Sequence, residues 1–248
     1  MGQIKFDFSG EKYVVTGASS GMGHKVALEL AASGAKVLAI GRNKDRLRSL
    51  YQQNPAYITI ASVDVCDADK LETTIANFVI EHGKLNGGVH AAGIMTLTPL
   101  RSIDEIQAKR IMDVSFWAGI SLLRLITKAK YGERGTSTVL FSSVCAESAE
   151  KGMLAYTAAK AAINSGIRSA AKEIASKGHR VNSILPGWVI SPMTDVASET
   201  TEVKKIYDKH PLGTGSPEDV AGIVMFLLSE SASWITGSNL VVDGGYLA

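Results

Sequence analysis

Residues 13–23 read YVVTGASSGMG, an apolar, β-rich run that passes directly into a glycine-rich turn. Val26, Ala27, Leu28 and Leu30 continue after the turn with helical spacing. Such a turn lets the backbone approach a pyrophosphate, which the helix N-terminus attracts through unpaired N–H groups and a partial positive charge. Three glycines alone could form an ordinary tight turn, and their spacing differs from the G-x-G-x-x-G fingerprint. Their position in a first β-α unit favours a dinucleotide site.

The same alternation of strand and helix continues along the chain. Further strand-like runs are KVLAIG (36–41), AYITIASV (56–63), NGGVHAAG (86–93), STVLFSS (137–143), RVNSIL (180–185) and NLVVDGG (239–245), with helical patterns near 22–32, 44–53, 69–81, 103–130, 155–176 and 217–229. Continuous hydrophobic strands between helices indicate a parallel sheet covered on both faces. We predict an α/β, doubly wound (Rossmann) fold with a mostly parallel seven-stranded sheet, in a single domain over residues 1–248.

The composition argues against several classes of protein. Hydrophobic residues make up 46% of the chain and charged residues 20%, which is typical of an ordered globular protein. A formal charge of +2 gives no support for nucleic-acid or membrane binding. The two cysteines, Cys66 and Cys145, fit neither a disulfide framework nor a metal-ligand spacing. We expect no metal site and a cytoplasmic location.

One polar segment interrupts the alternation. Residues 191–216 read SPMTDVASETTEVKKIYDKHPLGTGS, with prolines and glycines towards the ends. Excursions of this length in compact domains are often lids over a ligand, and the alternative is an ordinary solvated loop. We predict a substrate loop over about 191–216.

The ends of the second and third strands carry the next candidates. Dinucleotide folds meet the adenosine ribose after the second strand, where an acidic residue suits a free 2′-hydroxyl and an arginine suits a 2′-phosphate. Gly41 and Arg42 stand there, so NADP(H) is predicted over NAD(H), unless Arg42 is only an exposed charge at a helix entry. Asp64 follows the third strand and is placed either to accept the adenine amino group or to cap a loop.

A candidate acid/base centre lies in the second half of the chain. Tyr156 and Lys160 are four residues apart in YTAAK, so a helix places them on one face. An adjacent ammonium favours the phenolate and lowers a tyrosine pKa from its ordinary value of about 10. Ser143 closes the fifth strand, where open parallel sheets bind ligands, and its hydroxyl can hydrogen-bond a substrate oxygen. Y-x-x-x-K alone indicates a helix-surface pair, but this combination indicates catalysis.

With these motifs the chain resembles the short-chain dehydrogenase/reductase family over nearly its whole length. The resemblance rests on TGASSGMG (16–23), FSS (141–143) followed by YTAAK (156–160), RVNSILPGWV (180–189) and ITGSNLVVDGG (235–245), in the family's order. It implies a nicotinamide-dependent oxidoreductase in which Tyr156 is the general acid/base. It also implies that Lys160 lowers the pKa of Tyr156 and holds the nicotinamide ribose, and that Ser143 positions the substrate carbonyl.

The predicted cofactor contacts combine the motif residues with positions that the resemblance implies around the nicotinamide. They are Gly17, Ser19, Ser20, Gly21, Met22, Gly23, Arg42, Asp64, Val65, Ala91, Ala92, Gly93, Tyr156, Lys160, Pro186, Gly187, Val189 and Ser191. Ser191 stands where the family usually has threonine, so the hydroxyl is kept.

The chain departs from the family pattern at two places. The family's N-N-A-G after the fourth strand is His90-Ala91-Ala92-Gly93 here, which keeps the small residues and loses two amide side chains. The helix asparagine that supports a proton relay through the lysine in relatives falls at Ser115, whose hydroxyl can still hold a water. We predict a working but altered relay through Ser115. His90 is either a substitute in that relay or, as we favour, a packed strand-end histidine.

The substrate is less clear than the reaction. The chain is similar to the NADPH-dependent bacterial 3-oxoacyl-carrier-protein reductases, but the same scaffold also handles sugars and other secondary alcohols. The predicted cleft residues are Ser143, Met95, Cys145, Glu147, Met153, Trp188 and Met193. Glu147 either recognises a polar group or is an exposed carboxylate at a helix start. A catalytically weak NADP(H)-sensing protein is the alternative class. A hydrolase with Ser143 as its nucleophile is not supported, because the sequence around Ser143 lacks the G-x-S-x-G elbow.

The resemblance also implies a homodimer or homotetramer acting on a small molecule. The helical stretches 103–130 and 155–176 and the C-terminal strand are the expected contacts. Apolar residues such as Phe116 and Trp117 fit a buried face, but periodicity does not distinguish the core from a subunit interface.

Overall fold

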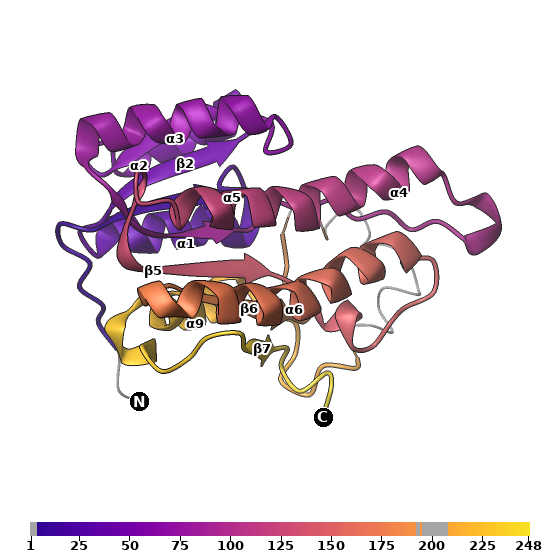
Figure 1. The fold of residues 1–248 in the computed structure, drawn as a ribbon. Helices are drawn as coiled ribbons and strands as arrows, with labels where there is room; N and C mark the ends of the chain where they lie inside the picture. Colours follow the sequence, from indigo (N-terminus) through magenta and orange to yellow (C-terminus); the bar gives the residue numbers. More distant parts are fainter. Residues whose placement is uncertain (1–3, 192–193, 195–207) are drawn as a thin grey trace.

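The computed structural model describes residues 4–191, 194 and 208–248, and Figure 1 shows their path through a central sheet. The strands are β1 (Lys12–Thr16), β2 (Lys36–Gly41), β3 (Ile58–Ser62), β4 (Leu85–His90), β5 (Gly132–Phe141), β6 (Arg180–Pro186) and β7 (Asn239–Val242). They form a seven-stranded sheet in the order β3-β2-β1-β4-β5-β6-β7, and every pairing is parallel. The chain winds outward from β1 to β3 and returns to β4 beside β1, which confirms the doubly wound prediction.

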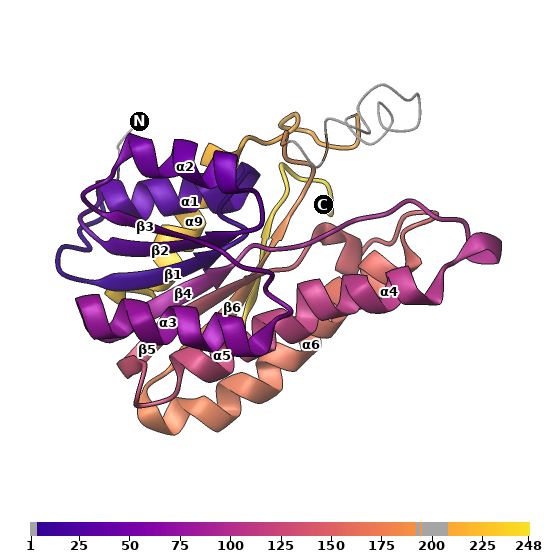
Figure 2. The same cartoon turned by 90° about the horizontal axis from the view of Figure 1, so that it is seen from above.

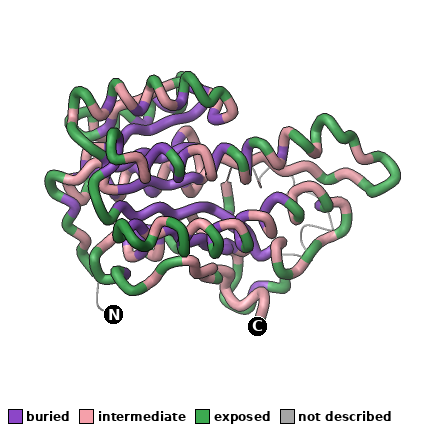
Figure 3. Tube along the Cα trace, viewed as in Figure 1, coloured by how far each residue is buried: buried purple, intermediate pink, exposed green. Residues whose placement is uncertain are grey.

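Helices cover both faces of the sheet, as Figure 2 shows from above. One face carries α1 (Gly21–Ala32), α2 (Lys44–Gln53) and α9 (Pro217–Leu228), and the other carries α3 (Ala68–His82), α5 (Ala118–Ile126) and α6 (Leu154–Ile174). In β2, Val37 and Ala39 join the core under α1, whereas Leu38 and Ile40 join the core under α3. Successive strand side chains point to opposite faces, and both faces are buried (Figure 3). The strands therefore read as continuous hydrophobic runs.

The helix predicted over 103–130 is interrupted in the structure. It begins later, at α4 (Glu105–Met112), because Asp104 caps it by accepting the Ile106 backbone N–H. A π-turn over Asp113–Trp117 then separates α4 from α5. Such turns inside helices occur frequently at functional sites.

The two ends of the 191–216 segment are tied together beside the sheet. The Ile190 N–H donates to the Gly215 carbonyl, and the Gly215 N–H donates to the Trp188 carbonyl, each over 2.9 Å. Residues 192–193 and 195–207 lie outside the described residues, so the substrate loop stays a prediction. Within the described part of the chain, no helix is long and apolar enough to cross a bilayer.

Candidate active site

Two adjoining cavities open at the carboxyl ends of the parallel strands. The first, called here the nucleotide pocket, is lined by Gly17, residues 19–23, 41–43, 63–65 and 91–94, and by Arg46, Arg110, Val114 and Ser191. The second, called here the substrate cavity, is lined by Ser143, Tyr156 and residues 186–189, and by side chains described below. Met22 and Ser191 line both cavities, so the two cavities are direct neighbours.

The glycine-rich turn brings the backbones of the β1 and β4 ends into contact. Gly17 has a φ of +73°, and a Cβ on it would lie 2.6 Å from the Ala91 carbonyl carbon. A Cβ on Gly23 would lie 2.6 Å from the Gly17 carbonyl oxygen. Ser20, the N-cap of α1, makes no side-chain cap hydrogen bond, and the first helical turn has no acidic residue. The helix amides are therefore left for an anionic group, which fits a pyrophosphate.

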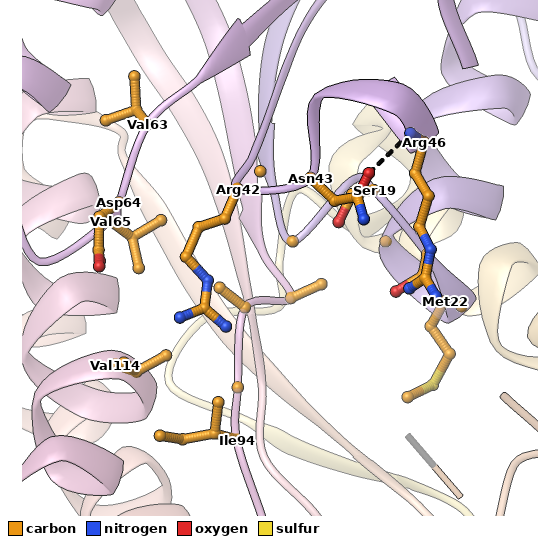
Figure 4. A pocket seen from close by; sticks show the side chains of 18 of the residues that line it. Ser19, Met22, Arg42, Asn43, Arg46, Val63, Asp64, Val65, Ile94 and Val114 are labelled. Atoms are coloured by element: carbon orange, nitrogen blue, oxygen red, sulfur yellow. Dashed lines mark hydrogen bonds between the residues drawn. The ribbon is translucent and has the colours of Figure 1, made fainter. Parts of the chain in front are cut away.

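Two arginines approach the nucleotide pocket at the end of β2. Figure 4 shows the Arg42 guanidinium extending into the pocket, and Arg46 from α2 lines it as well. Asn43 caps α2 by accepting the Arg46 backbone N–H over 2.9 Å, which orders the turn between them. A Cβ on Gly41 would lie 3.0 Å from the Ser19 Cβ. A large acidic side chain would be crowded there, whereas two arginine side chains line the pocket near this point. Sequence reasoning missed Arg46, although it lies only four residues after Arg42.

Asp64 is already engaged on another wall of this pocket. One of its oxygens accepts the Cys66 backbone N–H over 3.0 Å, and the other pairs with the Arg110 guanidinium. The hydrogen bond from the Cys66 N–H lowers the pKa of Asp64 most, and the Arg110 guanidinium lowers it further, although partial burial acts in the opposite direction. The loop-capping alternative is thus observed, while the adenine contact stays a prediction. Arg110 comes from α4, and no signal in the sequence linked it to this pocket.

Ser143, Tyr156 and Lys160 converge where β5 ends and α6 begins. Ser143 caps a short 3-10 turn (Val144–Ala146), its Oγ accepting the Cys145 N–H over 3.1 Å. Tyr156 and Lys160 lie in the first two turns of α6. The Lys160 Nζ donates to the Phe141 carbonyl over 2.6 Å and lies 5.4 Å from the centroid of the Tyr156 ring. The three side chains predicted as the chemical centre are therefore neighbours.

The two central pKa values reflect burial. Loss of water raises the pKa of Tyr156, and Cys145 raises it further, while the Ser143 hydroxyl acts in the opposite direction. Loss of water also lowers the pKa of Lys160 to about 8. The sequence argument, which predicted a lowered tyrosine pKa, is wrong for this structure. Burial of the phenol, which the sequence did not reveal, raises the pKa. The nearby Lys160 ammonium donates to the Phe141 carbonyl.

The substrate cavity contains most of the predicted cleft residues and lacks one. Met95, Ser143, Cys145, Met153 and Trp188 line it, as do the predicted nicotinamide neighbours Pro186, Gly187 and Val189. Met193 lies outside the described residues. Glu147 does not line the cavity; it is exposed and its carboxylate accepts a hydrogen bond from Asn164 of α6 over 3.0 Å, so the cleft contact is wrong and the exposed-carboxylate alternative is observed. The acid in the wall is Glu150, which sequence reasoning missed together with His210 and Tyr246.

Comparison with known proteins agrees with this geometry. A family model described as enoyl-(acyl carrier protein) reductase matches residues 17–247. The chain belongs to the short-chain dehydrogenase/reductase family. It is 35% identical over 243 residues to a 3-oxoacyl-[acyl-carrier-protein] reductase of Rickettsia prowazekii, which covers 97% of this chain and 98% of the relative. It is 33% identical over 245 residues to an L-xylulose reductase of Caenorhabditis elegans, which covers 97% of each chain.

A solved short-chain dehydrogenase/reductase from Brucella melitensis, described as glucose/ribitol dehydrogenase, has the same fold. Its TM-score is 0.92 at 28% sequence identity, over 98% of this chain and 99% of that one. As a short-chain dehydrogenase/reductase, this protein is an oxidoreductase that interconverts CH–OH and C=O groups with a nicotinamide cofactor.

The two departures from the family pattern lie side by side in the core. His90 is fully buried; its Nε2 donates to the Val114 carbonyl in the π-turn over 2.9 Å, and its Nδ1 accepts from the Thr16 hydroxyl over 2.8 Å. Both ring nitrogens are satisfied, as expected of a packed strand-end histidine. The buried Ser115 Oγ has no hydrogen-bond partner among the described residues. A Cβ on Gly93 would lie 3.9 Å from this Oγ and 3.5 Å from the Lys160 Nζ, so Ser115 lies on the lysine side of the site.

Proposed function

We propose that this chain is an NADP(H)-dependent reductase of ketones. The observation that carries the cofactor preference is the pair of arginines, Arg42 and Arg46, that line the nucleotide pocket where β2 ends at Gly41. The acid/base role rests on the convergence of Ser143, Tyr156 and Lys160 at the adjoining cavity. When bound, NADPH supplies the hydride that reaches the carbonyl carbon.

The protein's own residues then have distinct tasks. The Ser143 hydroxyl donates to the substrate oxygen and stabilises the charge that develops there. The Tyr156 hydroxyl gives its proton to that oxygen as the alcohol forms. The ammonium of Lys160, 5.4 Å from the tyrosine ring, favours the resulting phenolate and is available to hold the nicotinamide ribose. The Ser115 hydroxyl, which has no hydrogen-bond partner in the part of the chain that the structure describes, is available to hold a water that resupplies the proton through Lys160.

Two substrate classes are candidates. A 3-oxoacyl thioester is supported by the 35% identical reductase, whose name specifies an acyl-carrier-protein substrate. A keto-sugar is supported by the similarity to an L-xylulose reductase and by the polar residues Glu150 and Tyr246 in the cavity wall.

We further propose a cytoplasmic homodimer or homotetramer. Ile106 and Trp117 on the outer helices are 80% and 56% exposed, which suits a subunit contact, and a strictly monomeric protein in light scattering would contradict it.

The cofactor preference is tested by titrating the purified protein with NADPH and with NADH. Wild type should bind NADPH more tightly, and Arg42→Ala should weaken NADPH binding about tenfold to a hundredfold while leaving NADH binding unchanged. Arg48→Ala is the matched control, because Arg48 is exposed on α2 and pairs only with Asp45 among the described residues. Equal losses for both cofactors would contradict the 2′-phosphate role.

Turnover tests the reaction with the same samples. Consumption of NADPH against 3-oxoacyl thioesters and keto-sugars is expected. Tight NADPH binding without turnover of any carbonyl would favour the sensing alternative, and failure to bind either cofactor would overturn the proposal.

A further inference from the structure

The wall of the substrate cavity contains a hydrogen-bonded cluster from three distant parts of the chain. Glu150 follows the 3-10 turn after β5, Lys209 lies near the end of the 191–216 segment, and Tyr246 follows β7. The Tyr246 hydroxyl donates to the Glu150 carboxylate over 2.6 Å, and the Lys209 Nζ donates to it over 2.7 Å. Glu150 and Tyr246 both line the cavity that contains Tyr156, whereas Lys209 is exposed and is not among the lining residues.

The cluster presents hydrogen-bond acceptors to the cavity. Both contacts with Glu150 reach the same oxygen, Oε1, so within the described part of the chain no hydrogen bond occupies Oε2. The hydrogen bond from Lys209 lowers the pKa of Glu150 most, and the hydrogen bond from Tyr246 lowers it further. Glu150 is therefore an ionised acceptor at neutral pH. The Tyr246 hydroxyl donates a hydrogen bond to Glu150, and Ser148 and Lys209 also form side-chain hydrogen bonds with Tyr246, so Glu150 Oε2 is the more open of the two acceptors.

The cluster is also held in place before a ligand arrives. The His210 ring lies 4.8 Å from the Tyr246 ring, centroid to centroid, and its Nε2 accepts the Trp188 backbone N–H over 3.0 Å. His210 is buried, so Tyr246 packs against a fixed surface. Acceptors that need no rearrangement bind their donors at a lower entropic cost.

The rest of the wall shows which ligand would satisfy these acceptors. It includes the apolar side chains of Met22, Met95, Val144, Met153 and Trp188. A ligand bound between this wall and the Glu150 carboxylate displaces water from the carboxylate. This displacement costs free energy unless the ligand supplies a hydrogen-bond donor. A thioester carbonyl or a plain ketone has only acceptors, whereas an alcohol hydroxyl has a donor.

We propose that Glu150 and Tyr246 form a subsite that binds hydroxyl groups of the substrate, and that the natural substrate is a small hydroxylated ketone. Glu150 Oε2 and the Tyr246 oxygen accept from these hydroxyls while the ketone oxygen meets Ser143 and Tyr156. Lys209 and His210 are positioning residues that hold the two acceptors. This inference rests on the proposed function, because it assumes that the carbonyl is reduced beside Tyr156.

The test uses the full chain with NADPH and a matched set of ketones. The set contains 2-butanone, 4-hydroxy-2-butanone, L-erythrulose and acetoacetyl-N-acetylcysteamine, so that hydroxyl content varies on a four-carbon ketone. Wild type should show a kcat/KM for L-erythrulose at least about tenfold above that for 2-butanone. In Glu150→Gln and Tyr246→Phe, kcat/KM for the hydroxylated ketones should fall about tenfold to a hundredfold, chiefly through KM, while that for 2-butanone stays unchanged.

The matched control is Glu147→Gln, which alters a carboxylate three residues away that contacts Asn164 outside the cavity. This variant should leave kcat/KM unchanged for all four ketones. Calorimetric titration of the NADPH-bound protein with erythritol, which NADPH cannot reduce, gives a readout independent of turnover. Binding is expected in wild type and in Glu147→Gln and should be lost in Glu150→Gln.

The failures of the two proposals are distinguishable. Equal losses for 2-butanone and L-erythrulose in Glu150→Gln would show a merely structural role and would overturn the subsite. A wild type that reduces 2-butanone or the thioester in preference to L-erythrulose would also overturn the subsite but leave the reductase standing. Absence of turnover with every ketone would overturn the proposed function, and erythritol binding would then decide the subsite by itself.

Discussion

The nucleotide pocket and the substrate cavity adjoin, yet they are built in different ways. The nucleotide pocket is made mainly by short turns after β1 to β4, each contiguous in sequence. The substrate cavity collects side chains as distant as Met95 and Tyr246. The nucleotide pocket depends on backbone shape, because a side chain at Gly17 or Gly23 would clash with neighbouring backbone atoms. In the substrate cavity, side-chain chemistry prevails, through Ser143 and Glu150. A site of the first kind can be recognised from local sequence, whereas the second depends on which distant segments meet.

Tyr156→Phe should have the largest effect, and it separates the two regions. Removing the hydroxyl removes the proton donor, so kcat should fall about a thousandfold. NADPH affinity should stay within about twofold, because the substitution removes one hydroxyl and changes no residue that lines the nucleotide pocket. Steady-state kinetics with the best ketone and a fluorescence titration with NADPH measure the two quantities. The control is Tyr51→Phe, on the exposed side of α2. Turnover at the wild-type rate would remove Tyr156 from the mechanism.

Gly17→Ala tests whether backbone approach shapes the nucleotide pocket. The added methyl would lie 2.6 Å from backbone atoms of Ala91, at a φ of +73°. We expect a loss of at least about 2 kcal/mol in the free energy of unfolding and at least about a tenfold loss of NADPH affinity. Gly222→Ala is the matched control, because a Cβ there meets nothing within 4 Å, and in α9 it should stabilise the protein by up to about 1 kcal/mol. Similar behaviour of the two variants would contradict the backbone argument.

His90 joins the end of β4 to the π-turn beside both cavities, and its burial predicts a pH dependence. Burial, together with the Lys160 charge, lowers the pKa of His90 from 6.5 to about 4. The unfolded chain therefore binds the proton more readily than the folded one, so this contribution to stability is present above pH 6.5 and is lost as the pH falls through about 4. The full contribution is about 3 kcal/mol.

Urea unfolding of wild type and His90→Asn between pH 7 and 4 measures this effect, which is limited to acid pH. The free-energy difference between the two proteins should shrink or reverse in favour of the variant as the pH falls. His82→Asn, on α3, is the control and should follow wild type. A pH-independent difference between wild type and His90→Asn would contradict a neutral, buried His90.

Prediction from sequence succeeded where the physical cause is local. The glycine-rich turn, the end of β2 just before Arg42 and the helical spacing of Tyr156 and Lys160 each follow from a few consecutive residues. It failed where two causes compete. Two acids follow Ser143 in one loop, and nothing local shows that Glu147 contacts Asn164 while Glu150 meets Tyr246. The π-turn was missed for a similar reason, because apolar periodicity runs through it without a break.

The sequence by itself determined the doubly wound α/β fold, the glycine-rich turn after β1 and the helical spacing of Tyr156 and Lys160, because backbone conformation and side-chain periodicity are local properties of the chain. Only the tertiary structure decided that Arg46 and Arg110 line the nucleotide pocket and that the buried Ser115 hydroxyl has no hydrogen-bond partner among the described residues. It likewise decided that Glu150, rather than Glu147, lines the substrate cavity. The physical reason is that burial, ion pairing and cavity shape depend on segments brought together by packing.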